Sequence, residues 1–195
     1  EGAWRARDEL ARRACDIEIE VLGKPIGKQD QYIAAFGGLQ DIRFMPDGSV
    51  SVHPIVCASG VRERLAGNLM LFFTGMHRDA GSVLGEARRR LESRADSRAV
   101  VDGLVATAGT AREALMSGDV NRLGRLLDDS WRLKKQMASN VSNGRLDAIY
   151  DAARHAGADG GKISGAGAGG CLLLFVRPRK QRAVREAMRA AGLRE

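Results

Sequence analysis

The chain has 195 residues, of which 44% are hydrophobic and 28% charged, a composition typical of a globular protein with one or two cores. Its net charge of +7 favours anionic ligands without selecting among them, while the 5% aromatic content and the lack of a recognisable binding motif argue against nucleic acid. Three scattered cysteines argue against a disulfide framework or structural zinc, and no apolar run is long enough to span a membrane, so we expect a cytoplasmic protein.

The first part of the chain is predicted to contain a helix and a hairpin. Residues 3–22 read as a helix because apolar side chains recur at helical spacing. Residues 39–56 read as a hairpin, with Pro46-Asp47-Gly48 at the turn. Because the sequence opens beside or within a helix, we expect that a preceding part of the protein is missing from it.

The rest of the chain alternates between buried strands and amphipathic helices. Residues 69–75 read as a strand, and a strand, a glycine-rich loop and a second strand follow near residue 162. The helical patterns cover residues 79–95, 98–116, 119–138, 142–156 and 179–191. This order predicts the α+β class.

The glycine-rich segment, residues 160–170, contains six glycines among eleven residues. Glycine permits a positive φ and close backbone approach, so successive N–H groups can hold a phosphate, with Lys162 and Ser164 adding a cation and a hydroxyl. The alternative is a tight turn in which glycine only avoids steric strain. If the segment holds phosphate, Gly167→Val should lower turnover while the melting temperature stays within a few degrees.

A lone carboxylate, Asp30, lies between the amides Gln29 and Gln31 in the sequence GKQDQYIAAFGG. Such a carboxylate can accept a proton from a substrate hydroxyl, although a turn or capping role is an equal alternative from the local sequence. Glu18 and Glu20 lie upstream, where they form either a solvated helix face or a ligand for a hard cation such as Mg²⁺.

Taken together, these segments resemble the GHMP kinase superfamily. EIEVLGKPIGKQDQ is similar to the segment that carries the catalytic Asp in galactokinases, and KISGAGAGGC to the superfamily's third motif. A nearer resemblance is to D-glycero-D-manno-heptose 7-phosphate kinases, through GKQDQYIAAFGG, LMLFFTGMHRDAGSVL and the closing third of the chain. The superfamily's first motif and its P-x-x-x-G-L-G-S-S-type phosphate loop do not occur in these residues.

The resemblance implies transfer of a phosphoryl group from ATP, with Mg²⁺, to the anomeric hydroxyl of a heptose 7-phosphate. It implies that Asp30 contacts the acceptor hydroxyl and that Glu18 holds the metal ion. The implied substrate-binding residues are Lys28, Gln29, Gln31 and Arg78. The implied phosphate- or nucleotide-binding residues are Lys162, Ser164, Gly165, Ala166 and Gly167.

The resemblance also implies two parts. Residues 1–62 would be the end of the kinase N-terminal domain, and residues 63–195 a ferredoxin-like C-terminal domain. We expect these residues alone to be inactive, and to expose surface that the missing N-terminal portion covers, so that a homo-oligomer is a further expectation. Three alternatives remain open: another sugar or small alcohol as acceptor, a binding or regulatory module without catalysis, and a basic nucleic-acid-binding domain.

Overall fold

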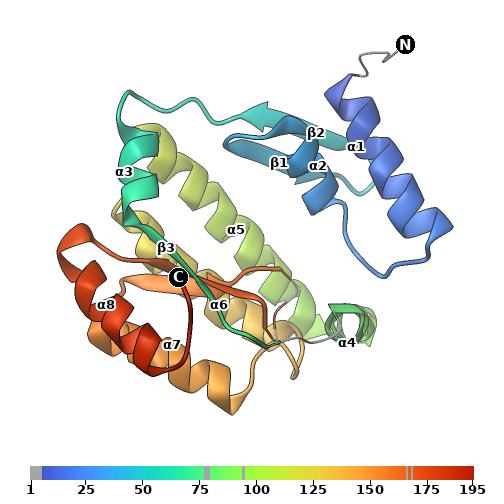
Figure 1. Ribbon diagram of the computed structural model, residues 1–195. Coiled ribbons are helices and arrows are strands. Elements are labelled where there is room, and N and C mark those ends of the chain that lie inside the picture. The colour runs from blue at the N-terminus through green and yellow to red at the C-terminus, as the bar shows by residue number, and fades with distance from the viewer. Residues whose placement is uncertain (1–5, 77–79, 94, 166, 168) are drawn as a thin grey trace, which may run out of the picture. The chain divides into compact units, whose positions relative to one another are not determined.

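The computed structural model describes residues 6–76, 80–93, 95–165, 167 and 169–195, and Figure 1 shows the order of the elements. The chain forms two compact units, Glu1–Val56 and Cys57–Glu195. Each unit is described by itself below. None of the described helices is long and apolar enough to cross a membrane.

The first unit begins with a helix that changes its winding. Helix α1 (Arg7–Cys15) continues directly into a π-helical segment, η1 (Asp16–Val21), where the N–H of Leu22 donates to the carbonyl of Ile17, five residues back. The helix predicted from periodicity is confirmed, but its last turns are wider than α-helical. Wide turns of this kind often occur at functional sites.

The short helix α2 (Gln29–Phe36) and a two-stranded antiparallel hairpin complete the first unit. Strands β1 (Gln40–Phe44) and β2 (Val50–Pro54) form the hairpin that the sequence predicted, and in its register Ile42 lies opposite Val52. In the turn, the Asp47 carboxylate accepts bonds from the backbone N–H (2.9 Å) and hydroxyl (2.6 Å) of Ser49. Tyr32 stands at the centre of the small core, stacked on Phe36 and edge-on to Phe44.

The second unit is a three-stranded antiparallel sheet with six helices in its described part. The strands, in the spatial order β3-β5-β4, are β3 (Leu69–Phe73), β5 (Cys171–Phe175) and β4 (Gly160–Ile163). The helices are α3 (Val61–Asn68), α4 (Ala80–Ser93), α5 (Ala95–Ser117), α6 (Arg122–Met137), α7 (Gly144–Ala156) and α8 (Pro178–Ala190). The α+β class predicted from the sequence is confirmed.

The main core lies on one face of this sheet. Alternation along β3 and β5 buries Met70, Phe72, Leu172 and Leu174, which are at most 3% exposed. Buried side chains of α7 and α8 join the same cluster, and these two helices lie side by side (Figure 1). By contrast, Leu71 on the other face of β3 is 49% exposed. Period-two burial of this kind is what a sheet covered mainly on one side requires.

Two glycines let helix α6 pack directly against strand β4. A β-carbon at Gly160 would collide with the carbonyl oxygen of Gly124 on α6. A β-carbon at Gly124 would in turn lie 3.0 Å from the Phe175 ring. A β-carbon at Gly161 would collide with the carbonyl of Leu173 on β5. The first two glycines of the glycine-rich segment therefore serve packing, and the phosphate hypothesis no longer applies to Gly160 and Gly161.

Candidate functional site

Asp30 lies in the first turn of α2 with its side chain exposed. Its negative charge is favourable there, because the N-terminal end of a helix is positive. Its carboxylate has no hydrogen bond or ion pair with any residue that the structure describes, and the start of α2 has no side-chain cap. Asp30 therefore makes no capping hydrogen bond, and its carboxylate is left available to a ligand.

Glu18 is held between a cation and an amide. Its Oε2 accepts from Lys24 Nζ at 2.9 Å, and its Oε1 accepts from Gln31 Nε2 at 3.1 Å. These bonds, the one from Lys24 being the stronger influence, lower the pKa of the Glu18 carboxyl, so it stays ionised at neutral pH. Because Gln31 follows Asp30 directly, Glu18 also fixes the start of α2. Glu20 is exposed and contributes to neither contact.

The other predicted substrate-binding residues near Asp30, namely Lys28, Gln29 and Gln31, also lie at the start of α2. Lys28 is exposed and its ammonium group donates to the carbonyl of Gly48, 3.4 Å away, which ties the start of α2 to the hairpin turn. Gln29 is exposed, whereas Gln31 is only 7% exposed and its Oε1 has no hydrogen-bond partner. Gln31 thus acts inward on Glu18, and Lys28, Gln29 and Asp30 form the outward group.

The fit of Mg²⁺ to Glu18 depends on the Lys24 contact. Within the described residues, no three His, Cys, Asp or Glu side chains come together as a metal cluster. Mg²⁺ is often held by only one or two carboxylates together with substrate phosphates, so a single ionised carboxylate is a sufficient protein contribution. Glu18 fits that requirement once Lys24 moves away from Oε2.

The glycine-rich turn joins β4 to β5 in the second unit. Its start is closed by the Ser164 N–H donating to the Cys171 carbonyl at 2.8 Å. Its end is fixed to the chain after β3, because the Gly170 carbonyl accepts from both the N–H (2.9 Å) and the hydroxyl (2.8 Å) of Thr74. The Gly170 N–H donates to the Met76 carbonyl at 3.0 Å. The turn is therefore anchored at both ends, while Ser164 and Gly165 at its start are exposed.

The glycines of this turn have different roles. Gly165 has φ 81° and a β-carbon there would meet nothing, so only its backbone conformation requires glycine. Gly167 has φ 116° and its β-carbon would lie 2.9 Å from the Val141 carbonyl oxygen. A substitution at Gly167 therefore perturbs packing as well as any phosphate contact. Gly167→Val cannot separate the two roles, whereas a change at Gly165 can.

Sequence reasoning missed one cation at this turn. The ammonium group of Lys134, in the last turn of α6, donates to the carbonyl of Gly165. Nothing in the sequence links positions 31 residues apart, although Lys134 lies in the closing third of the chain, which carries part of the family resemblance. Lys162, which was predicted, lies on β4 and is half-buried, and removal from water lowers the pKa of its ammonium group.

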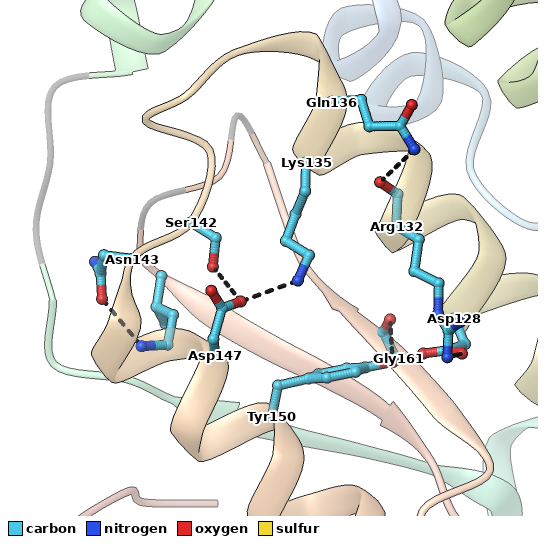
Figure 2. A network of polar contacts seen from close by, with 10 residues as sticks. Asp128, Arg132, Lys135, Gln136, Ser142, Asn143, Asp147, Tyr150 and Gly161 are labelled. Atoms are coloured by element: carbon cyan, nitrogen blue, oxygen red, sulfur yellow. Dashed lines mark hydrogen bonds and ion pairs between the residues drawn. The ribbon is translucent and has the colours of Figure 1, made fainter.

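A polar network supports α6 and α7 beside this turn (Figure 2). The Asp147 carboxylate on α7 accepts from Ser142 Oγ at 2.9 Å and Lys135 Nζ at 3.1 Å. Deeper in the unit, the Tyr150 hydroxyl donates to Asp128 on α6 at 2.6 Å and lies 3.2 Å from the Gly161 carbonyl. Burial, reinforced by the Asp128 carboxylate, raises the pKa of Tyr150, which stays a neutral donor.

The structure thus assembles the predicted residues into two groups, one in each unit. Glu18, Lys28, Gln29, Asp30 and Gln31 gather around the start of α2 in the first unit. In the second unit, Lys162, Ser164, Gly165 and Gly167 belong to β4 and the glycine-rich turn. Arg78 and Ala166 lie outside the described residues.

Comparison with known proteins identifies a family domain in the second unit. Residues 111–193 match the family described as GHMP kinases C terminal. The chain is 36% identical, over 181 residues, to a D-glycero-alpha-D-manno-heptose 7-phosphate kinase from Campylobacter jejuni, covering 93% of this chain and 53% of the relative.

The solved structures that resemble this chain include sugar kinases as well. A putative sugar kinase from Campylobacter jejuni superposes with a TM-score of 0.72 at 33% identity, covering 98% of this chain and 54% of that one. A D-glycero-D-manno-heptose 1-phosphate kinase from Bacteriodes thetaiotaomicron has a TM-score of 0.65 at 28% identity, covering 95% and 49%. The chain therefore spans about half the length of the proteins it matches.

Proposed function

Because this chain carries a GHMP kinase C-terminal domain, we propose that it is part of an ATP-dependent kinase that phosphorylates a small sugar phosphate. The acceptor that we propose is D-glycero-D-manno-heptose 7-phosphate, which receives the phosphoryl group on its anomeric hydroxyl. The heptose 7-phosphate kinase relative, matched over nearly the whole chain, supports this choice.

The observation that carries the proposal is the unpartnered, exposed carboxylate of Asp30 at the start of α2. In our account, Asp30 accepts the proton of the acceptor hydroxyl, or orients that hydroxyl, as the phosphoryl group is transferred. Glu18 holds α2 in place through Gln31. Lys28 and Gln29, exposed on the same turn, bind the acceptor, and we assign Arg78 to its phosphate by resemblance.

The nucleotide phosphates are assigned to the glycine-rich turn. Backbone N–H groups of Gly165, Ala166 and Gly167 bind phosphate oxygens, with Ser164 as a further donor and Lys162 as a cation. Lys134 adds a cation beside Gly165. Glu18 is the residue that would hold Mg²⁺, which neutralises charge on the phosphates when bound. These roles rest on the open surface at Gly165, the anchored turn and the ionised state of Glu18.

The acceptor is tested by measuring ADP release from the complete protein with a panel of compounds. The panel contains heptose 7-phosphate, heptose 1-phosphate, galactose, fucose and mevalonate, each at equal concentration. We expect the highest kcat/KM for heptose 7-phosphate. The 28% identical heptose 1-phosphate kinase favours heptose 1-phosphate as the second candidate. A preference for galactose, fucose or mevalonate would retain the kinase and replace the acceptor.

A binding module without catalysis is the alternative for these residues by themselves. We propose that the complete protein supplies a further phosphate-binding segment and that the 195 residues alone release no ADP. Leu10, Ile17 and Val21, each more than half exposed along α1 and η1, would be covered by that segment or by a second copy. Cys15, Cys57 and Cys171 form no disulfide, which suits our placement of the kinase in the cytoplasm.

A further inference from the structure

A basic hollow lies in the second unit at the end of the β4–β5 hairpin opposite the glycine-rich turn. The hollow has a volume of about 860 Å³. It is lined by Asp119, Asn121, Arg122, Arg125, Arg154, His155, Gly157, Ala158, Asp159, Arg177, Arg179 and Lys180. Residues 157–159 precede β4, and Arg177 follows β5 closely, whereas the glycine-rich turn joins the other ends of these strands. The four residues of β4 separate the two ends by roughly 13 Å.

The charge of the hollow is strongly unbalanced. Six cationic side chains face two carboxylates, Asp119 and Asp159. Only Asp159 is paired, through Arg177 at 2.7 Å. The cations Arg122, Arg125, Arg179 and Lys180 are all exposed, and within the described part of the chain none of them has an ion pair or side-chain hydrogen bond. Crowding unpaired like charges costs free energy, which a bound anion would recover.

The remaining cations are held in place by the protein. Arg154 is half-buried, and its guanidinium group donates to the Ala158 carbonyl at 2.6 Å. Its other contact, with buried Asp128, is long at 4.0 Å. Arg177 is fixed by Asp159, and α8 starts at Pro178 without a side-chain cap, which adds the positive end of a helix to the same surface. The hollow therefore combines two positioned guanidinium groups with four free cations.

We infer that this hollow is a binding site for a small anion with two or more phosphate groups, at the end of the β4–β5 hairpin opposite the glycine-rich turn. A single phosphate would leave most of the cations unpaired, whereas two phosphates can be contacted from α6 and from α8 at once. Guanidinium groups suit this ligand because they bind phosphate oxygens in a bidentate manner. Among the described residues that line the hollow there is no Phe, Tyr or Trp, and His155 is the one ring that a base could stack on, whereas single-stranded nucleic acid binding depends on several such platforms.

The inference is tested by calorimetric titration of the chain with inorganic pyrophosphate. Arg125→Gln combined with Arg179→Gln removes one free cation from each helix, and both side chains are exposed, so the melting temperature should not change. We expect the Kd for pyrophosphate to rise at least tenfold. The matched control combines Arg62→Gln with Arg98→Gln, which removes the same charge from exposed positions outside the hollow, and should change the Kd less than twofold.

Three further arms define the ligand and locate its site. Titrations with ADP and with fructose 1,6-bisphosphate distinguish a nucleotide from a sugar bisphosphate as the ligand. The compound of the correct class should lose more affinity in the Arg125→Gln/Arg179→Gln variant. In a Lys134→Gln background, at the glycine-rich turn, the tenfold rise in Kd caused by Arg125→Gln with Arg179→Gln should remain. The pair Arg122→Gln and Lys180→Gln repeats the test if the first double variant is destabilised.

If the hollow variant and the control variant lost the same affinity for pyrophosphate, the effect would be one of net charge alone, and the inference would be overturned. Loss of pyrophosphate binding in Lys134→Gln alone would move the site to the glycine-rich turn, and no binding at millimolar pyrophosphate would also overturn it. If a 20-base-pair DNA duplex bound and pyrophosphate did not, the hollow would be a nucleic-acid surface instead.

Discussion

Gln31 donates its side-chain amide to the Glu18 carboxylate over 3.1 Å, and this bond joins the two acidic segments of the first unit. Gln31 is buried while the adjacent Asp30 is exposed, as expected for neighbouring residues on one helical turn. The same contact that satisfies Glu18 therefore fixes the face of α2 that presents Asp30. Glu18 has a positioning role in the structure, and the proposed metal role is additional.

Replacing Glu18 by Gln should separate these roles. The amide can still accept from Gln31, but it loses the negative charge that Mg²⁺ requires. In the complete protein we expect the Mg²⁺ concentration for half-maximal rate to rise several-fold. Glu20→Gln, two residues away and without the Gln31 contact, is the control. Equal shifts in the two variants would leave only a general charge effect.

Asp30→Asn should lower turnover of the complete protein by roughly 10²-fold or more, which is the usual scale for loss of a general base. The KM for ATP and the melting temperature should hardly change, because the carboxylate is exposed and has no described partner. Steady-state kinetics of Asp30→Asn beside Asp16→Asn, an exposed carboxylate on η1, provide the measurement. Near-normal turnover would remove Asp30 from the mechanism.

At the glycine-rich turn, Gly165→Ala and Gly167→Ala should differ. Gly165 has open space around it, so an alanine there should cost only about 1–2 kcal/mol for the left-handed backbone. Its turnover should nevertheless fall at least tenfold, since a small displacement of a positioned phosphate has large kinetic effects. Gly167→Ala should lose more stability, because its β-carbon meets the Val141 carbonyl.

Thermal melts and ADP-release assays on the same preparations distinguish these outcomes. If the folded Gly165→Ala variant kept its specific activity, the glycine-rich turn would have only a structural role.

Tyr150→Phe should lower the free energy of unfolding by about 2 kcal/mol, as expected when a buried carboxylate loses a hydrogen-bond donor. The hydroxyl that is removed contacts Asp128 at 2.6 Å in the buried network of Figure 2. Ser142→Ala also removes a hydroxyl bond to a carboxylate, but at a half-buried position where Lys135 still pairs with Asp147. Its cost, measured by urea denaturation, should be under 1 kcal/mol. If the two variants lost the same free energy of unfolding, burial of the Asp128 network would add nothing to the strength of its hydrogen bond.

Most elements could be predicted from the sequence because their signals are local, but the short helices α2 (Gln29–Phe36) and α3 (Val61–Asn68) were missed. Helical periodicity located α6 and α7 within a few residues, and alternation with a Pro-Asp-Gly turn located the first hairpin. The change to π-helical winding at Asp16–Val21 leaves the apolar spacing almost unaltered, so periodicity could not detect it.

The contacts around the candidate site depend on tertiary proximity, which one sequence does not encode visibly. Lys134 reaches Gly165 only because α6 packs along β4, and that packing requires Gly124 and Gly160 to touch. The same contact explains why position 160 requires glycine, although in the sequence Gly160 reads as part of a phosphate-binding loop. Asp30 was located by its isolation among amides, but its lack of a partner needed the structure.

The most direct test of the account is the rate of ADP release by the complete protein with D-glycero-D-manno-heptose 7-phosphate. We predict release that requires both ATP and the heptose, with a second phosphate appearing on the anomeric position of the product in ³¹P NMR. The rate with the heptose should exceed the rate without it by at least tenfold. A folded complete protein whose ADP release is the same with and without every sugar phosphate, sugar and mevalonate in the panel would contradict the assignment as a small-molecule kinase.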